Sequence, residues 1–131
     1  MGARYSYPTS EQDRLFLPSY LHQPGPSCDH YDASQTVSRH ARLHNYPEVH
    51  YGTIGSANVV VKDPAVRDAL KRDMNILCVE MEAAGLMDNF PCLVIRGICD
   101  YADSHKNKRW QPYAAAVAAA YMKELLMVIP A

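Results

Sequence analysis

Apolar residues follow a regular pattern only in the second part of the chain, from Val49 onward. Residues 49–54 and the β-branched run 59–61 favour extended strands, and a shorter apolar run at 77–79 predicts a buried strand. The run 92–98 gives the strongest strand signal in the sequence. Because helical segments separate these runs, the pattern predicts an α/β fold in which helices cover a largely parallel or mixed sheet.

Three segments have the composition and end signals of helices. Asp63 is followed by proline, and an aspartate cap with proline at the first helical position is a strong helix start; this helix is expected to reach about Asp73. A second helix is predicted over 81–90, where a proline follows and ends it. The last helix is predicted from about Pro112 to Val128.

The first 48 residues lack any long periodic apolar pattern. They hold five of the nine prolines and five of the nine tyrosines, and the turn signal at 24–27 excludes a helix or central strand there. Their compact apolar anchor is the run 15–17. We therefore divide the chain into an irregular, insertion-like Pro/Tyr-rich segment at 1–48 and a regular α/β part at 49–131.

Composition and charge narrow the classes of function. The chain has 131 residues with 13 Lys and Arg against 14 Asp and Glu, so no basic excess favours nucleic acid as a partner. No apolar stretch approaches the roughly 20 residues that cross a bilayer, and no secretory signal opens the sequence. We expect a cytoplasmic or otherwise intracellular protein with reduced cysteines and no membrane partner. No metal is expected, since Cys28, His30, His40 and His44 match no standard ligand spacing.

Two carboxylates, Glu80 and Glu82, flank Met81 where a strand is predicted to lead into a helix. In extended backbone, residues two apart point to the same side, so both carboxylates can leave the strand together. A carboxylate beside apolar neighbours needs a hydrogen-bond donor, which the helix start or a ligand's hydroxyl groups can supply. The ordinary alternative is a helix-entry carboxylate with a partner that faces solvent.

Asp100 directly follows the strongest predicted strand, at the end where ligands bind in open α/β sheets. Burial there is expected to raise the pKa of Asp100, so that it donates a proton near neutral pH; the alternative is a turn or capping aspartate. Asp103 has the weaker case, because it begins a polar loop. Lys106, Lys108 and Arg109 in that loop are more typical of a solvated surface than of an anion site.

Two further features are compatible with a ligand. The stretch 52–58 is rich in small residues, which lets a ligand approach the backbone, and Ser56 and Asn58 offer hydrogen bonds; a tight β-turn explains it equally well. Trp110 is the one tryptophan and is followed closely by Tyr113. This pair is interpreted either as an aromatic wall over a flat ligand or as core at the start of the last helix.

In combination these pieces resemble the nucleoside phosphorylase and nucleosidase family, which includes purine nucleoside phosphorylases and methylthioadenosine nucleosidases. The resemblance rests on three motifs in order, Gly52-Thr53-Ile54-Gly55-Ser56-Ala57-Asn58, Val79-Glu80-Met81-Glu82-Ala83-Ala84-Gly85 and Val94-Ile95-Arg96-Gly97-Ile98-Cys99-Asp100-Tyr101-Ala102-Asp103. It looks most like the fungal branch, whose domain often heads multidomain proteins. The likeness covers Val49 to about Val128 and corresponds to the C-terminal half of the domain; the glycine-rich N-terminal half has no visible match.

The resemblance implies a partial three-layer α/β sandwich with a central mixed sheet. It also implies roles for eight residues. Asp100 would act as general acid at the purine N7, and Glu82 and Met81 would hold the ribose hydroxyls with support from Glu80. Ser56 and Asn58 would lie at the base side with Trp110 near the base, and Cys99 would contact the substrate. Cys99 stands where relatives often have serine, and Ala57 stands where they have glycine.

The implied function of the full-length domain is cleavage of a purine nucleoside N-glycosidic bond, by phosphorolysis or hydrolysis. Phosphate would be a possible co-substrate, and no cofactor is expected. We expect the C-terminal half by itself to be inactive, and to associate with a second copy or with other domains of a longer protein. The alternatives are a non-catalytic module that senses purine nucleosides in signalling, or a truncated remnant.

Overall fold

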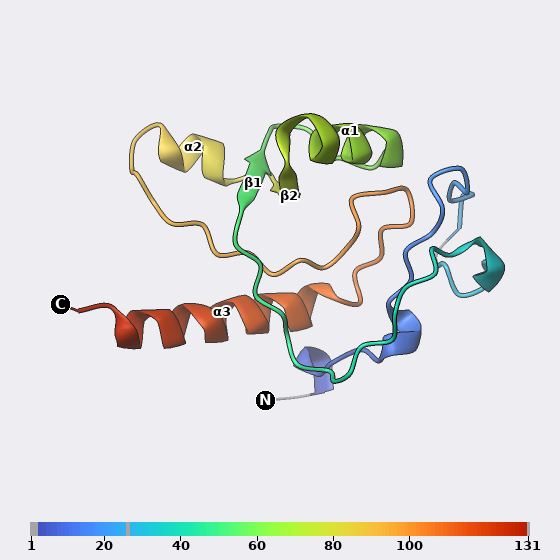
Figure 1. Ribbon diagram of the computed structural model, residues 1–131, viewed down its shortest axis with the longest axis horizontal. Helices are drawn as coiled ribbons and strands as arrows, with labels where there is room; N and C mark the ends of the chain where they lie inside the picture. Colours follow the sequence, from blue (N-terminus) through green and yellow to red (C-terminus); the bar gives the residue numbers. More distant parts are fainter. Residues whose placement is uncertain (1–2, 26, 131) are drawn as a thin grey trace.

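The computed structural model describes residues 3–25 and 27–130 (Figure 1). Strands β1 (Thr53–Ser56) and β2 (Ile76–Glu80) form a parallel two-stranded sheet, with Ile54 opposite Cys78 and Ser56 opposite Glu80. Helix α1 (Pro64–Met74) connects them, as a parallel pair requires. The mixture of helices with a small parallel sheet confirms the predicted α/β class.

Helix α1 begins and ends as the sequence predicts. The Asp63 carboxylate accepts the N–H of Ala65 at 2.8 Å, and Pro64 occupies the first turn, where its missing N–H costs nothing. At the other end Asn75 adopts a left-handed conformation, with φ of 51°, and Lys71 donates to its side-chain oxygen at 2.8 Å. The helix therefore ends one residue beyond the predicted Asp73.

The other two helices differ in how well they were predicted. Helix α3 (Gln111–Val128) confirms the last predicted helix. Helix α2 (Ala83–Met87) is much shorter than the predicted 81–90. It starts late because the Glu80 carboxylate accepts the N–H groups of Glu82 and Ala83, at 2.7 and 2.8 Å, which holds the chain in a turn before the helix.

The strongest predicted strand, 92–98, is wrong: these residues form no strand in the structure. The stretch between α2 and α3 passes instead between the β1–β2 unit and α3 (Figure 1). Gly97 lies against the backbone of Ala114 in α3, so close that a Cβ at this position would come within 2.0 Å of the Ala114 carbonyl oxygen. A strand needs a neighbouring strand for its backbone hydrogen bonds as well as β-branched residues. This stretch packs against a helix instead.

Two other strand predictions also need correction. The first strand begins only at Thr53, so residues 49–52 are not part of it, and the run 59–61 forms no strand but leads into the Asp63 cap. Among the described residues the sheet therefore has two parallel strands, where a central mixed sheet was expected.

The segment 1–48 is irregular over its described residues, as predicted. It contains short 3-10 turns at Ala3–Tyr5, Ser10–Gln12 and Ala33–Gln35, and one antiparallel bridge between Phe16 and Thr36. Phe16, from the predicted apolar anchor, is 3% exposed and its ring stacks on that of His105 at 4.0 Å. This contact ties the N-terminal segment to the loop that precedes α3.

The described part of the chain buries little apolar surface. Phe16, Ala83 and Ala114 are its buried apolar residues, whereas many large apolar side chains are exposed. The exposed set includes Val59, Leu86, Phe90, Leu93, Leu126, Met127 and Val128. Apolar exposure on this scale is typical of a surface that contacts other protein. None of the helices in the described residues combines the length and apolar character that crossing a membrane requires.

Candidate functional site

The loop between residues 98 and 111 is folded by three aspartate or asparagine side chains. Asp100 Oδ1 accepts the N–H of Ala102 at 2.9 Å, Asp103 Oδ1 that of His105 at 2.9 Å, and Asn107 Oδ1 that of Arg109 at 3.1 Å. Such side chains mimic a backbone turn, so the loop turns back on itself three times. Asp103, which begins this polar loop, is 4% exposed and so belongs to the interior.

Asp100 is held as a carboxylate by its neighbours. Its side chain is 19% exposed, and the Lys106 ammonium donates to Oδ1 at 3.0 Å. The Cys99 thiol donates to Oδ2 at 3.6 Å. Burial raises the pKa of Asp100, but the Ala102 N–H and Lys106 outweigh it, so the pKa lies below its ordinary value of 3.8. The predicted rise in pKa is therefore wrong, because the prediction included burial and not the hydrogen bonds.

The sequence did not predict the ion pairs that Lys106 and Arg109 form in this region. Lys106 pairs with Asp100 and is partly buried, so it does not belong to a solvated cluster. Arg109 pairs with Asp29 at 2.8 Å but is exposed, as is Lys108, so the predicted solvated surface holds for these two residues. The three turns bring Lys106 back to Asp100, six residues earlier. A repeated Asx-turn pattern in the sequence is the signal that indicates such a return.

The N-terminal segment closes over this loop through polar contacts. The Tyr101 hydroxyl donates to the Asp13 carboxylate, and Arg39 donates to both groups. Burial, followed by the contact with Asp13, raises the pKa of Tyr101 to about 12. His105 is bonded to the Tyr20 carbonyl oxygen at 2.7 Å. The loop that carries Asp100 is thus fixed by residues that lie between 62 and 88 positions earlier in the chain.

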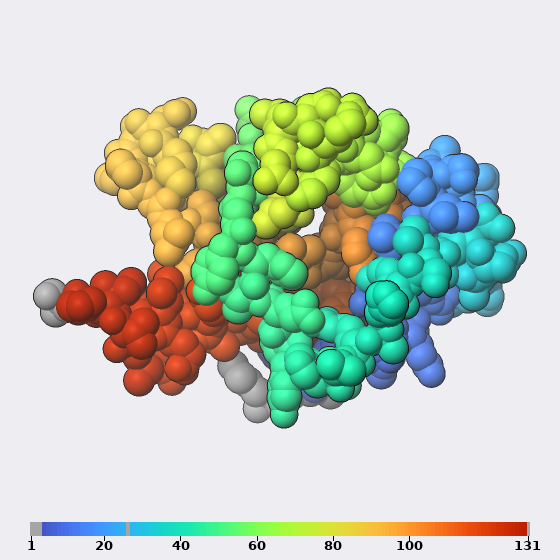
Figure 2. All heavy atoms as spheres, in the orientation of Figure 1, coloured from blue at the N-terminus to red at the C-terminus, as the bar shows by residue number. Residues whose placement is uncertain are grey.

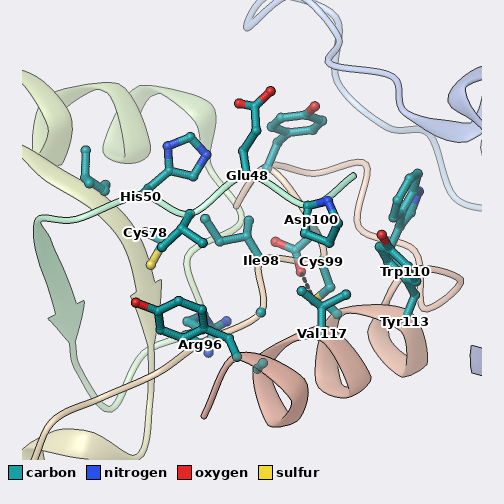
Figure 3. Close-up of a pocket in the computed structure, with 18 of the residues that line it drawn as sticks. Glu48, His50, Cys78, Arg96, Ile98, Cys99, Asp100, Trp110, Tyr113 and Val117 are labelled. Carbon is teal, nitrogen blue, oxygen red and sulfur yellow. Dashed lines mark hydrogen bonds between the residues drawn. The ribbon is translucent and has the colours of Figure 1, made fainter. Parts of the chain in front are cut away.

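A cavity of about 550 Å³ lies beside this loop. Its wall combines the stretch 47–54, residues 93–101, the N-terminal segment and one face of α3. In the space-filling view the molecular surface is hollowed between α1 and the N-terminal segment (Figure 2). The close-up shows Asp100 and Cys99 above α3, near Val117, with Trp110 and Tyr113 to one side (Figure 3). A cavity of this size accommodates a small organic ligand.

Three of the predicted site residues line this cavity together: Asp100, Cys99 and Trp110. The Trp110 ring lies 5.3 Å from Tyr7 and 5.9 Å from Tyr113, between centroids, and its indole N–H donates to the Gln12 carbonyl oxygen at 3.2 Å. Burial, with the neighbouring Asp100 carboxylate, raises the pKa of Cys99, which keeps the thiol as a hydrogen-bond donor. Arg96, not among the predicted site residues, adds a cation to the same wall.

Glu80 is buried, at 6% exposed, whereas Glu82 and Met81 are exposed. Burial raises the pKa of Glu80, but the Ser56 hydroxyl and the N–H groups of Glu82 and Ala83 outweigh it and leave the pKa below 4.5. Glu80 Oε1 is buried without a hydrogen-bond partner in the described structure. The Glu82 carboxylate accepts the N–H of Met81 at 3.0 Å.

Ser56 and Asn58 lie at the end of β1. The Ser56 hydroxyl accepts the N–H of Ala84 at 3.0 Å, which attaches α2 to the sheet, and Ser56 lines a second cavity of about 300 Å³. Asn58 is exposed and lines neither cavity. The two cavities adjoin, since both are lined by Gly52, Ile54, Leu93 and Val94.

The structure does not bring the three predicted carboxylates into one cavity. Asp100 lines the larger cavity, whereas Glu80 and Glu82 line neither. The physical reason is that Glu80 is turned onto the N–H groups at the start of α2, whereas Glu82 is exposed and its carboxylate accepts the N–H of Met81. The predicted roles of Glu80, Met81 and Glu82 therefore remain predictions.

No cluster of three or more His, Cys, Asp or Glu side chains that could hold a metal ion occurs in residues 3–25 and 27–130. Cys28 and His105 do lie together, with the thiol sulfur 3.6 Å from Nδ1. The His105 Nε2 contact with Tyr20 and the Phe16 stack give this pair a structural role in joining the N-terminal segment to the loop.

Comparison with known proteins gives three related findings. Residues 3–127 match the family model of the phosphorylase superfamily. A nucleotide-binding leucine-rich repeat (NLR)-like protein of Hyaloscypha variabilis is 48% identical over 126 residues, 95% of this chain and 12% of that protein. The ATP nucleosidase Cap17 of Escherichia coli is 34% identical over 80 residues, 56% of this chain and 16% of that protein.

The chain thus spans less than a fifth of the length of these relatives. No solved structure matches. The family match covers the irregular N-terminal segment as well as the α/β part, so both are included in the likeness. On this match, the chain belongs to the phosphorylase superfamily.

Proposed function

We propose that the cavity beside Asp100 binds the base of a purine nucleoside or nucleotide, as part of a site that cleaves the N-glycosidic bond. The observation that carries this proposal is that Asp100, Cys99 and Trp110 line one cavity in a chain of the phosphorylase superfamily. The volume of about 550 Å³ suits a nucleoside, and an aromatic ring beside a carboxylate suits a flat base with polar edges.

The chemistry assigned to Asp100 is transfer of a proton to the leaving base. As the glycosidic bond breaks, the ribose gains positive charge and the base gains electrons, and a proton at N7 stabilises the departing base. Oδ1 already accepts two hydrogen bonds, so Oδ2 is the oxygen assigned to the base. Since neighbouring groups keep the free Asp100 ionised, its carboxylate takes up a proton from solvent when the bound base desolvates it, and Oδ2 passes that proton to N7 as the glycosidic bond breaks.

The ribose side is assigned to the β2–α2 junction. Glu82 and Met81 would contact the hydroxyl groups, and Glu80 would support them, because its Oε2 accepts the N–H of Glu82 at 2.7 Å. The unpartnered Glu80 Oε1 supplies a further acceptor. Ser56 and Asn58 stay assigned to the base side, and Ser56 lines the cavity that adjoins the Asp100 cavity.

The similarity to Cap17, an ATP nucleosidase, supports hydrolysis and an adenine nucleotide as the first substrate to test. Phosphorolysis, with phosphate as co-substrate, is the alternative reaction. A second candidate function, purine sensing within a longer signalling protein, is supported by the NLR-like relative and by the exposed apolar surface, which suits contact with further domains or with a second copy.

A chromatographic assay for free base tests the proposal. The chain is incubated with ATP, adenosine, inosine or guanosine, with and without phosphate. Release without phosphate indicates a nucleosidase, release that requires phosphate indicates a phosphorylase, and saturable binding without release supports the sensing module. If the chain neither releases a base nor binds any of these compounds, the proposal is contradicted.

The matched pair of variants is Asp100→Asn and Asp73→Asn. Asparagine keeps the shape of Asp100 but cannot transfer the proton, so release should stop while binding persists. Asp73 lies on α1, 58% exposed and paired with Arg72, and its variant should behave as the wild type. Release that continues in Asp100→Asn would show that another group is the acid.

A further inference from the structure

The peptide group between Tyr101 and Ala102 is bonded at both of its polar ends. Its N–H donates to Asp100 Oδ1 at 2.9 Å, and its carbonyl oxygen accepts a hydrogen bond from the Arg67 guanidinium, with Nη1 at 3.2 Å. Because a peptide group is planar, the two bonds together fix the direction that this plane faces. Arg67 lies on α1, 34 residues before Tyr101, so the second bond comes from a separate element of the fold.

The backbone of Ala102 adopts a conformation that alanine disfavours. Its φ is 51°, in the left-handed region, where the Cβ crowds the following carbonyl oxygen. A half-turn of the Tyr101–Ala102 peptide plane would carry φ of Ala102 into the negative range and remove the strain, but it would also turn the N–H away from Asp100. A strained conformation persists only where its surroundings hold it, so the groups bonded to this peptide keep the N–H on the carboxylate.

The Arg67 side chain is suited to hold the peptide. It is 23% exposed, its Nε donates to Asp68 at 2.8 Å, and its Nη1 also lies 3.7 Å from the Asp103 carboxylate, which is 6% exposed. The guanidinium is thus supported by its own helix and by the loop, and its donors form a rigid planar fork. The Tyr101 hydroxyl is bonded to the N-terminal segment, but that contact fixes the ring and leaves the peptide plane free to turn.

The other donors to Asp100 do not fix the direction of its carboxylate in the same way. Lys106 donates to Oδ1 at 3.0 Å, but from the end of a flexible side chain that is 29% exposed. The Cys99 thiol, which donates to Oδ2, is a weak donor. Among the described residues, the Ala102 N–H is the backbone group that bonds this carboxylate. The orientation of Asp100 at the cavity wall therefore depends on the Tyr101–Ala102 peptide.

We propose that Arg67 is a positioning residue of this site: it holds the Tyr101–Ala102 peptide in its strained orientation and thereby keeps the Asp100 carboxylate directed for the bound base. This inference rests on the proposed function for the use of the cavity. It adds a residue on α1 that lies outside the cavity wall and outside the three sequence motifs. Arg67 does not touch the ligand; it acts through the peptide.

The amide proton of Ala102 tests this restraint without any ligand. An amide bonded to a carboxylate shifts as that carboxylate titrates, so in chain labelled with ¹⁵N-alanine the Ala102 signal, identified by its loss in Ala102→Gly, should follow the titration of Asp100. Arg67→Met should abolish this dependence, whereas Arg67→Lys, which can still donate to the Tyr101 carbonyl oxygen, should retain it. Arg72→Met, the same change at a 70% exposed position on α1, is the matched control and should behave as the wild type.

A glycine at position 102 separates loss of the restraint from loss of the Arg67 charge. Glycine adopts a positive φ without strain, so the double variant Arg67→Met with Ala102→Gly should return the N–H to Asp100. With a ¹⁵N-glycine label, the amide of residue 102 should again follow the Asp100 titration. The removal of a positive charge would not be reversed by this second change, and the dispersion of the amide signals reports whether each variant is folded.

Binding of adenosine, measured by isothermal titration calorimetry on the full chain, relates the restraint to the site. Arg67→Met should bind at least about tenfold more weakly than the wild type, the usual worth of a hydrogen bond to a charged group, and Arg67→Lys should restore binding. An Ala102 signal that still follows Asp100 in Arg67→Met, or an unchanged affinity, overturns the role of Arg67 alone. A wild type that does not bind adenosine contradicts the proposed function, and the amide titration then decides by itself whether Arg67 holds the peptide.

Discussion

The close approach of Gly97 to α3 leads to a quantitative prediction for Gly97→Ala. A Cβ built on Gly97 lies 2.0 Å from the Ala114 carbonyl oxygen and 2.5 Å from its carbonyl carbon. Ala114 is 5% exposed and belongs to the first turns of an 18-residue helix, so the obstacle is rigid backbone and not a side chain that can rotate away. The methyl group can be accommodated only if α3 and the stretch 92–98 move apart.

Overpacking of this kind costs about 1–3 kcal/mol in the free energy of unfolding, and the backbone clash places Gly97→Ala at the upper end. For a chain of this size each kcal/mol lowers the melting temperature by roughly 4 °C, so a fall of roughly 8–12 °C is expected. Urea unfolding followed by far-UV circular dichroism measures the free energy, and a thermal scan gives the melting temperature.

Gly85→Ala is the matched control. Gly85 lies in α2, and a Cβ there meets nothing within 4 Å. Alanine is favoured over glycine in a helix by about 1 kcal/mol, so this variant should be as stable as the wild type or slightly more stable. If Gly97→Ala unfolds at the same urea concentration as the wild type, the packing of 92–98 against α3 described here is wrong.

Two further variants test the junction and the N-terminal anchor. The pKa of Glu80 is lowered in the folded chain, so its carboxylate stabilises the fold above about pH 4.5, and this contribution is lost as the pH falls through the folded pKa. Glu80→Gln should reduce the loss of stability between about pH 5 and 3 in urea titrations at a series of pH values, and an identical acid profile would exclude this role. Phe16→Ala removes a ring that is 3% exposed and should cost about 3 kcal/mol. It should also speed proteolysis within residues 17–37, and an unchanged digestion rate would contradict the anchoring role.

Elements with local signals were predicted well from the sequence. Helix α1 follows from the Asp63 cap and the proline after it, α3 from its long apolar run after Pro112, and β2 from the apolar run at 77–79. Each of these signals lies within the element it predicts or directly before it. The membership of the family also follows from three local motifs, and the match over residues 3–127 confirms it.

Features that depend on distant residues were not predictable in this way. The run 92–98 has strand composition, but it can form a strand only beside another strand. It lies against α3 instead. The pKa of Asp100 depends on Lys106, which the loop turns bring back to it. The polar contacts of Tyr101 with Asp13 join residues 88 positions apart, and no periodicity reports such a pair.

The orientation of the Glu80 and Glu82 carboxylates depends on hydrogen bonds within the β2–α2 junction. The sequence correctly placed Glu80 and Glu82 at a strand-to-helix junction, but their spacing did not indicate which carboxylate turns inward. Capping of the N–H groups at 82 and 83 decides this, and it directs Glu80 away from the cavity of Asp100. The site residues that do share a cavity, Asp100, Cys99 and Trp110, all come from one end of the loop or the other.

The central claim is that a purine nucleoside enters the cavity lined by Asp100 and Trp110, and the intrinsic fluorescence of the chain tests it most directly. Trp110 is the one tryptophan, so its emission reports on this wall alone, whether or not the bond is cleaved. Titration with adenosine should change the emission saturably as the base approaches the indole ring. An emission that stays constant up to millimolar adenosine would contradict the account.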